Sequence, residues 1–173
     1  MRGTFRISRG ARTETPTIGA EIEEAGKVGK AECVPYPHYG ESKDSVMAEI
    51  ETVRSGIESG MSRAELQEAL PAGAARNALD CALWDLEAKL SGKRAWELAG
   101  IVPPLPVVSA MTLSLDSPEN MAEAARASAH LPLLKLKVIG GGDLERVTAV
   151  RSGAPKSRLI VDANEGWQPE MLD

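Results

Sequence analysis

Two lysines, Lys135 and Lys137, stand two residues apart in the apolar run Leu-Leu-Lys-Leu-Lys-Val, residues 133–138. A run of this kind predicts a β-strand, whose alternate side chains point to opposite faces, so both amines share one face. If the strand is buried on both faces, two like charges share one pocket, which is costly and indicates a chemical role. If one face is solvated, the pattern is only that of an amphipathic strand, and the strand alone does not decide between the two.

Polar side chains also end the next predicted strand, which covers residues 158–161 and is followed by Asp162 and Asn164. Active sites of parallel α/β folds form at the carboxyl ends of strands, and both lysines lie late in their strand. Thr112 lies near the same end of the preceding strand. A carboxylate, an amide and two amines at neighbouring strand ends would suit a metal-and-base site. The alternative is that Asp162 and Asn164 are N-caps of a following helix.

The elements that would position these residues alternate between strand and helix. The sequence predicts strands over 107–113, 133–138 and 158–161. It predicts helices from the Ser117 cap to His130 and from an Asp143 cap to Gly153, the latter with Leu144, Val147 and Val150 facing inward. This β-α-β-α-β order with apolar strands predicts a parallel sheet buried on both faces. A closed barrel needs roughly 250 residues, so the sheet is either small and open or the first part of a barrel.

The preceding part of the chain is of a different kind. Strands are expected over 5–8, 17–23 and 30–34 in one small antiparallel sheet, with residues 9–16 as a polar connection and 35–40 as a loop. Helices are expected over about 46–57, 62–70 and 74–90, the second opened by a Ser62–Glu65 capping box. Three prolines at 103, 104 and 106 mark a linker, which predicts two domains, residues 1–104 and 105–173.

Composition and charge exclude several classes of protein. The net charge is −5 without a basic face, which argues against a nucleic-acid partner. No apolar run reaches transmembrane length, and the N-terminus has no apolar signal segment, so no membrane partner is expected. Cys33 and Cys81 lie far apart, which predicts two reduced, buried thiols in a cytoplasmic protein, although a disulfide stays open.

Two motifs together resemble the enolase superfamily, in its muconate-lactonizing subgroup. They are the Lys135-Leu-Lys137 strand and the run Val-Asp-Ala-Asn-Glu-Gly-Trp over residues 161–167. Residues 74–86 are similar to the long helix of that family's capping domain. Residues 5–10 and 35–40 resemble, more narrowly, the L-Ala-D/L-Glu (dipeptide) epimerases. The resemblance implies an α/β fold in which an α+β capping domain precedes a (β/α)7β TIM-type barrel, with this chain supplying the cap and the first three barrel strands.

The resemblance also implies roles for individual residues. Lys137 would be an acid/base catalyst and Lys135 its helper. Asp162 would be the first of three carboxylate ligands to Mg²⁺, with Asn164 supporting that site. Candidate substrate contacts are Thr112 and, on the two specificity loops of the cap, Arg9, Arg12, Tyr36 and Tyr39.

The implied chemistry suits these residue types. Removing a proton α to a carboxylate puts a second negative charge on the substrate, which a divalent metal stabilises as a Lewis acid. The base must be neutral, whereas a free lysine has a pKa of about 10.4. A second ammonium group nearby and partial burial both favour the neutral amine, which is why two lysines suit the task better than one.

The resemblance therefore implies a Mg²⁺-dependent isomerase that epimerises a small dipeptide such as L-Ala-L-Glu by 1,1-proton transfer. Two alternatives stay open: another enzyme of the subgroup, such as a cycloisomerase or N-acylamino acid racemase, and a non-catalytic fragment or interaction module. The opposing base and two further metal carboxylates are not found in the 173 residues. We therefore expect a truncated chain that folds poorly and has no epimerase activity alone. Whether the full-length protein is a homo-oligomer is left open.

Overall fold

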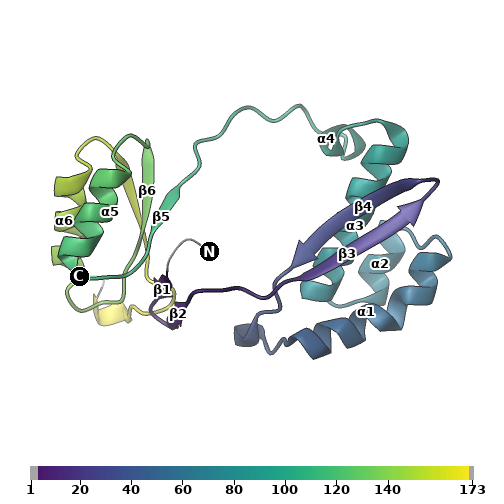
Figure 1. The fold of residues 1–173 in the computed structure, drawn as a ribbon, viewed down its shortest axis with the longest axis horizontal. Coiled ribbons are helices and arrows are strands. Elements are labelled where there is room, and N and C mark those ends of the chain that lie inside the picture. Colours follow the sequence, from purple (N-terminus) through teal and green to yellow (C-terminus); the bar gives the residue numbers. More distant parts are fainter. Residues whose placement is uncertain (1–3, 172–173) are drawn as a thin grey trace. The chain divides into compact units, whose positions relative to one another are not determined.

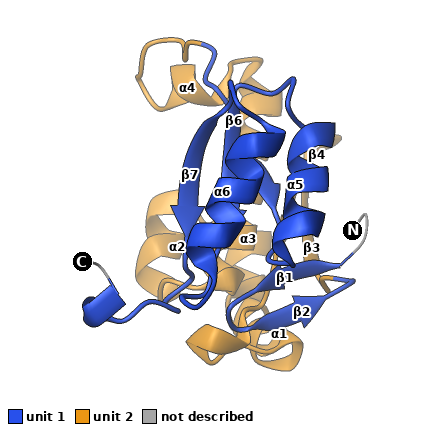
Figure 2. Ribbon diagram, turned by 90° about the vertical axis from the view of Figure 1, so that its left-hand side faces the viewer, with its two compact units in different colours: residues 1–14, 106–173 blue, residues 15–105 orange. Residues whose placement is uncertain are grey.

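The computed structural model describes residues 4–171, and the chain divides into two compact units (Figure 2). Unit 1 comprises residues 1–14 and 106–173, and unit 2 comprises residues 15–105. The N-terminal residues thus group with unit 1 instead of with the rest of the predicted 1–104 domain. Long-range hydrogen bonds give the reason, since the backbone N–H of Leu115 donates to the Arg6 carbonyl (3.1 Å).

Unit 2 is an antiparallel hairpin packed on helices (Figure 1). The hairpin pairs β3 (Ile18–Glu24) with β4 (Lys27–Cys33). Ala25 and Gly26 form its two-residue turn with φ of 47° and 72°, as a tight hairpin requires. The remaining elements are η1 (Pro37–Tyr39), α1 (Lys43–Glu58), α2 (Arg63–Ala69), α3 (Ala74–Ser91) and α4 (Ala95–Leu98).

Helix α3 forms the centre of unit 2 because its small residues let the hairpin approach closely. Ala75, Ala78 and Ala82 are fully buried in the core. The predicted capping box of α2 is confirmed, with Ser62 and Glu65 each bonding the other's backbone N–H. One prediction for α3 is wrong: Cys81 is exposed, so it is not a buried thiol. Both cysteines are free, which rules out the disulfide in this structure.

Unit 1 contains a three-stranded parallel sheet in the order β5-β6-β7. Its elements are β5 (Met111–Leu113), α5 (Pro118–Ala127), β6 (Leu133–Lys137), α6 (Asp143–Gly153), β7 (Arg158–Asp162) and η2 (Pro169–Met171). Helices α5 and α6 cover one face of the sheet (Figure 1). On that face Leu134, Leu136 and Val138 are fully buried, so the alternation predicted for this strand is confirmed.

The first predicted strand does not join the sheet of β3 and β4. Instead β1 (Phe5–Ile7) pairs with β2 (Gly10–Arg12) in a separate hairpin, and part of the predicted polar connection is strand. The pairing of such short strands depends on distant contacts, which local pattern does not reveal.

Three expectations about the parallel sheet are also corrected. The helix N-cap before α6 is Gly142, in a left-handed conformation, and Asp143 is the first helical residue. Leu144 is 76% exposed instead of facing inward. The sheet is not buried on both faces, because Ile160 and Val161 of β7 are 42% and 45% exposed. Within residues 4–171, no helix has both the length and the apolar character needed to cross a membrane.

The close contact between β4 and α3 makes a testable prediction. A Cβ on Gly29 would lie 2.2 Å from the Ala82 carbonyl oxygen and 2.6 Å from the Leu86 Cβ. We expect Gly29→Ala to destabilise the protein by about 1–3 kcal/mol through overpacking, measured by urea unfolding with circular dichroism. Gly19→Ala is the matched control on β3, because its nearest neighbour would be 4.0 Å away. Equal stability of the two variants would contradict the packing described.

Candidate active site

The candidate site lies on the sheet face opposite α5 and α6, at the carboxyl ends of the strands. The parallel register places Lys137 opposite Asp162 and aligns Thr112, Lys135 and Ile160 in one row. Side chains of residues in register point to the same face, so both lysines and Asp162 meet there. The Lys137 side chain is 8% exposed and that of Lys135 is 34% exposed. The more deeply placed amine is therefore the one at the strand end.

A single carboxylate joins the two lysines. Asp162 Oδ2 lies 2.7 Å from the Nζ atoms of both Lys135 and Lys137. Lys137 Nζ also donates to Asn164 Oδ1 at 2.7 Å, and the Asn164 backbone N–H donates to Asp162 Oδ1 at 2.9 Å. One carboxylate thus compensates both positive charges, and one amide orients the Lys137 amine.

These contacts decide the alternatives raised from sequence. The next described helix, η2, begins at Pro169, so Asp162 and Asn164 do not cap it. The strand is not merely amphipathic, because Lys137 is a buried charged residue with defined partners. The four residues form one connected polar cluster.

The electrostatics of the cluster centre on Asp162. Hydrogen bonds from Lys135 and Lys137 hold the pKa of this carboxyl well below its usual range, although partial burial acts in the opposite direction. The carboxylate is therefore ionised at neutral pH.

The β1–β2 hairpin and its turn contribute Arg9, which the sequence analysis named, and also Ser8 and Phe5, which it missed. Ser8 Oγ and Arg9 Nη1 donate to the Asn164 carbonyl at 2.9 Å and 3.1 Å, and Arg9 pairs with Glu165 at 3.1 Å. The Phe5 ring centroid lies 5.9 Å from Lys137 Nζ. Ser8 and Asn164 are 156 residues apart, so no local pattern could have revealed their contact.

The other predicted substrate residues are divided between the units. Arg12 lies 5.8 Å from the centroid of the Phe5 ring in unit 1. Thr112 stands in register with Lys135 and is partly buried. Tyr36 and Tyr39 belong to unit 2, where their ring centroids are 5.5 Å apart and both pack near His38.

The polar cluster offers few oxygen atoms to a magnesium ion. Mg²⁺ requires about six oxygen ligands in octahedral geometry. Asp162 and Asn164 offer side-chain oxygens that the lysines already engage. Among residues 4–171 no group of three or more His, Cys, Asp or Glu residues could hold a metal ion. The described residues therefore do not make a complete magnesium site by themselves.

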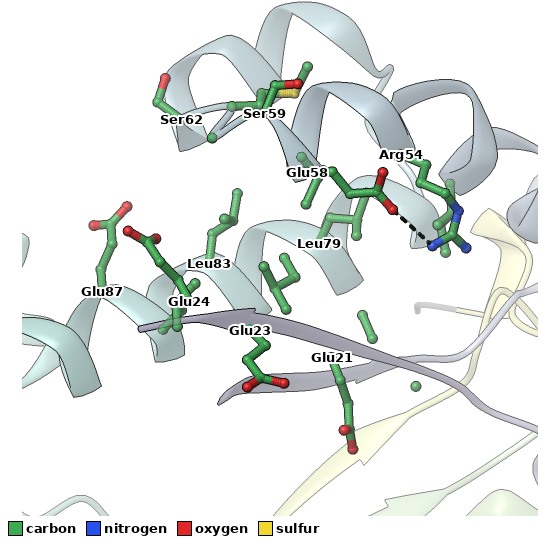
Figure 3. A pocket seen from close by; sticks show the side chains of 18 of the residues that line it. Glu21, Glu23, Glu24, Arg54, Glu58, Ser59, Ser62, Leu79, Leu83 and Glu87 are labelled. Atoms are coloured by element: carbon green, nitrogen blue, oxygen red, sulfur yellow. Dashed lines mark ion pairs between the residues drawn. The ribbon is translucent and has the colours of Figure 1, made fainter. Parts of the chain in front are cut away.

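A cavity of about 750 Å³ lies elsewhere, in unit 2, between β3, α1, α3 and the start of α2 (Figure 3). Its floor is apolar and its rim carries acids such as Glu24 and Glu87. Arg54 is the only basic residue among the described residues that line it, and it pairs with Glu58 at 3.8 Å. Without a base beside a reactive acid, this cavity is a weaker candidate for chemistry than the lysine cluster.

The chain is thus an α/β protein in which an α+β unit is combined with parallel β/α units, and polar groups gather at the carboxyl ends of the parallel strands. Residues 1–100 match the family described as "Mandelate racemase / muconate lactonizing enzyme, N-terminal domain". The chain belongs to this family, which is part of the enolase superfamily.

Three relatives illustrate the similarity. The chain is 48% identical over 170 residues to the L-Ala-D/L-Glu epimerase of Escherichia coli (strain K12), covering 97% of this chain and 53% of that protein. An enolase family member from Agrobacterium tumefaciens with homology to dipeptide epimerases, solved with sodium and L-Ala-L-Glu, has a TM-score of 0.93 at 48% identity, covering 99% and 52% of the two chains. The dipeptide epimerase of Cytophaga hutchinsonii, solved with Mg and D-Ala-L-Val, has a TM-score of 0.85 at 26% identity, covering 98% and 50%. The chain spans about half the length of the curated relatives it matches.

The bridging carboxylate predicts a pH dependence of stability. Because the folded-state pKa of Asp162 is lowered, its contribution is complete above the unfolded-state pKa of about 3.9 and is lost as the pH falls toward the folded value. We expect Asp162→Asn to destabilise the protein by about 1–3 kcal/mol at pH 7 and by less near pH 2.5, where part of the contribution of the carboxylate is lost, as measured by urea unfolding.

The control is Asp80→Asn, since Asp80 accepts a neutral amide hydrogen bond from Gln67 at 3.1 Å. A destabilisation by Asp162→Asn that is the same at both pH values would contradict the assignment of Asp162 as an ionised bridge.

Proposed function

We propose that the protein is an epimerase that removes and returns the proton on the carbon α to a carboxylate of a dipeptide, with Mg²⁺ as its cofactor. The main support is the meeting of Lys135, Lys137, Asp162 and Asn164 at the carboxyl ends of two neighbouring parallel strands. The similarity to dipeptide epimerases supports the same activity. The absence of a membrane-crossing helix from residues 4–171 is compatible with the cytoplasmic location that we propose.

Lys137 is the proposed acid/base catalyst. It is the more buried amine, and Asp162 and Asn164 each accept a hydrogen bond from its Nζ, so its position is defined. In the neutral form its amine takes the α-proton, and the electron pair of the C–H bond passes into the substrate carboxylate to give an enediolate. Inversion needs a proton returned to the opposite face by a second acid, which we do not assign to a described residue.

Lys135 is the proposed partner of that base. It shares Asp162 with Lys137 but is more exposed, so it can face the substrate carboxylate while Lys137 faces the α-carbon. A fixed ammonium group at this position would stabilise the negative charge that develops on the enediolate.

Asp162 is proposed to contribute one carboxylate to a Mg²⁺ site, with Asn164 supporting it. When bound, the cation would stabilise the enediolate as a Lewis acid. The Cytophaga hutchinsonii epimerase solved with Mg supports this choice of ion. The remaining oxygen ligands are not assigned to residues 4–171.

The proposed substrate contacts are Arg9, Arg12, Thr112, Tyr36 and Tyr39. Arginine guanidinium groups suit the carboxylates of an acidic dipeptide because they can donate two parallel hydrogen bonds. Arg9 lies beside the Asn164 carbonyl, and Arg12 lies near the Phe5 ring that neighbours Lys137. These positions support a role for the β1–β2 hairpin in substrate choice.

The proposal is tested by α-proton exchange. The product of the complete reading frame would be incubated in D₂O with Mg²⁺ and L-Ala-L-Glu, and loss of the glutamyl α-proton followed by NMR. We expect Lys137→Met to lower the exchange rate by about 10²–10⁴-fold, as loss of an acid/base catalyst does.

Lys156→Met is the control, because Lys156 is an exposed lysine of the same unit. Exchange by Lys137→Met at the wild-type rate would refute the assignment of the base. Faster turnover of an N-acylamino acid or of muconate than of any dipeptide would favour another activity of the subgroup.

A further inference from the structure

Asp143 makes more contacts than the start of a helix requires. Its carboxylate accepts hydrogen bonds from the backbone N–H groups of Ile139 (3.1 Å) and Gly140. It also accepts from the Trp167 indole Nε1–H at 2.8 Å and from Arg146 Nη1 at 3.0 Å. The side chain is 11% exposed. One buried carboxylate therefore joins the turn after β6 to the segment after β7.

The turn and the segment are packed as well as hydrogen-bonded. Gly140 has φ of 116°, and a Cβ there would lie 3.1 Å from the Met171 sulfur. A Cβ on Gly166 would lie 2.9 Å from the Ala163 carbonyl oxygen and 3.4 Å from that of Ile139. Little space therefore remains between the turn and the segment.

This segment carries the amide that orients Lys137. Asn164 has φ of 48°, in the left-handed region that costs a non-glycine residue free energy unless its surroundings hold it there. Ser8 holds its carbonyl, Asp162 holds its N–H, and Trp167 fixes the chain three residues later. Of these three contacts, only the Asp143–Trp167 hydrogen bond involves a side chain that lies outside both the β1–β2 hairpin and the polar cluster of the two lysines.

We propose that Asp143 is a positioning residue that acts through Trp167 to hold the segment 163–167, and with it Asn164, against Lys137. This role rests on the proposed function of Lys137. The donor set requires an ionised carboxylate, since two backbone N–H groups, an indole N–H and a guanidinium group all donate to it. Burial opposes its ionisation, yet hydrogen bonds from Trp167, Ile139, Gly140 and Arg146 hold the pKa of Asp143 below its usual range.

The test uses Trp167→Phe, which removes the indole N–H and keeps an aromatic ring, together with Asp143→Asn, in the product of the complete reading frame. We expect kcat for α-proton exchange of L-Ala-L-Glu to fall about tenfold or more in each variant, with KM changed by less than about twofold, because the ties orient a catalytic group. The matched controls are Trp84→Phe, whose indole stacks on Arg63 in unit 2, and Asp116→Asn, whose carboxylate accepts from the Ser117 N–H before α5. Both controls should retain wild-type kcat.

A double-mutant comparison separates positioning from general destabilisation. If Trp167 acts through Asn164, adding Trp167→Phe to Asn164→Ala should change kcat by less than about twofold. Multiplicative losses in the double variant, or an unchanged kcat in Trp167→Phe, would overturn the proposal.

A second measurement does not depend on enzymatic activity. An inactive wild-type protein would show that the proposed function fails, whereas hydrogen exchange tests the Asp143–Trp167 contact itself. Hydrogen exchange at the Trp167 indole and at the amides of residues 163–166 should be slow in the wild type and faster in Asp143→Asn. Equal exchange in the two proteins would overturn the proposed tie.

Discussion

The Asp162 carboxylate, placed between two ammonium groups of one strand, is the interaction on which unit 1 depends. Lys135 and Lys137 would repel each other on a half-buried face without this shared partner. The pairing is possible only in the observed register, because Asp162 stands opposite Lys137. A shift of one residue would turn the lysines toward α5 and α6 and bring Leu134 and Leu136 onto the polar face. The apolar and polar requirements of β6 thus select the same register.

The loop after β7 gives this cluster its defined geometry. Asn164 is held from the hairpin side by Ser8 and from the helix side through Trp167, in a backbone conformation that is unfavourable when unsupported. A base that must meet one proton of a small substrate benefits from such support, since orientation contributes strongly to the rates of proton transfer. The hairpin and the start of α6, which are distant from each other in sequence, therefore serve the same few atoms.

Much of this arrangement could be predicted from the sequence where the signal is local. The alternation in residues 133–138 predicts which side chains of β6 face the helices, and the Ser62 and Ser117 side chains accept from the helix N–H groups as expected. Long-range features could not be predicted in this way. The β1–β2 hairpin belongs to unit 1 because of contacts with residues more than one hundred positions away. The local sequence predicts Asp143 as a helix cap and cannot reveal its hydrogen bond from Trp167, which is 24 residues away. Family membership agrees with the resemblance carried by the lysine and aspartate motifs, whereas the roles of individual residues stay proposals.

The most direct measurement is a crystal structure of the product of the complete reading frame with Mg²⁺ and L-Ala-L-Glu. We expect a substrate α-carbon beside Lys137 Nζ, Lys135 near the substrate carboxylate, and the Asp162 carboxylate bound to the cation. A dipeptide bound away from β6, or a cation bound without Asp162, would contradict the proposed roles of these residues.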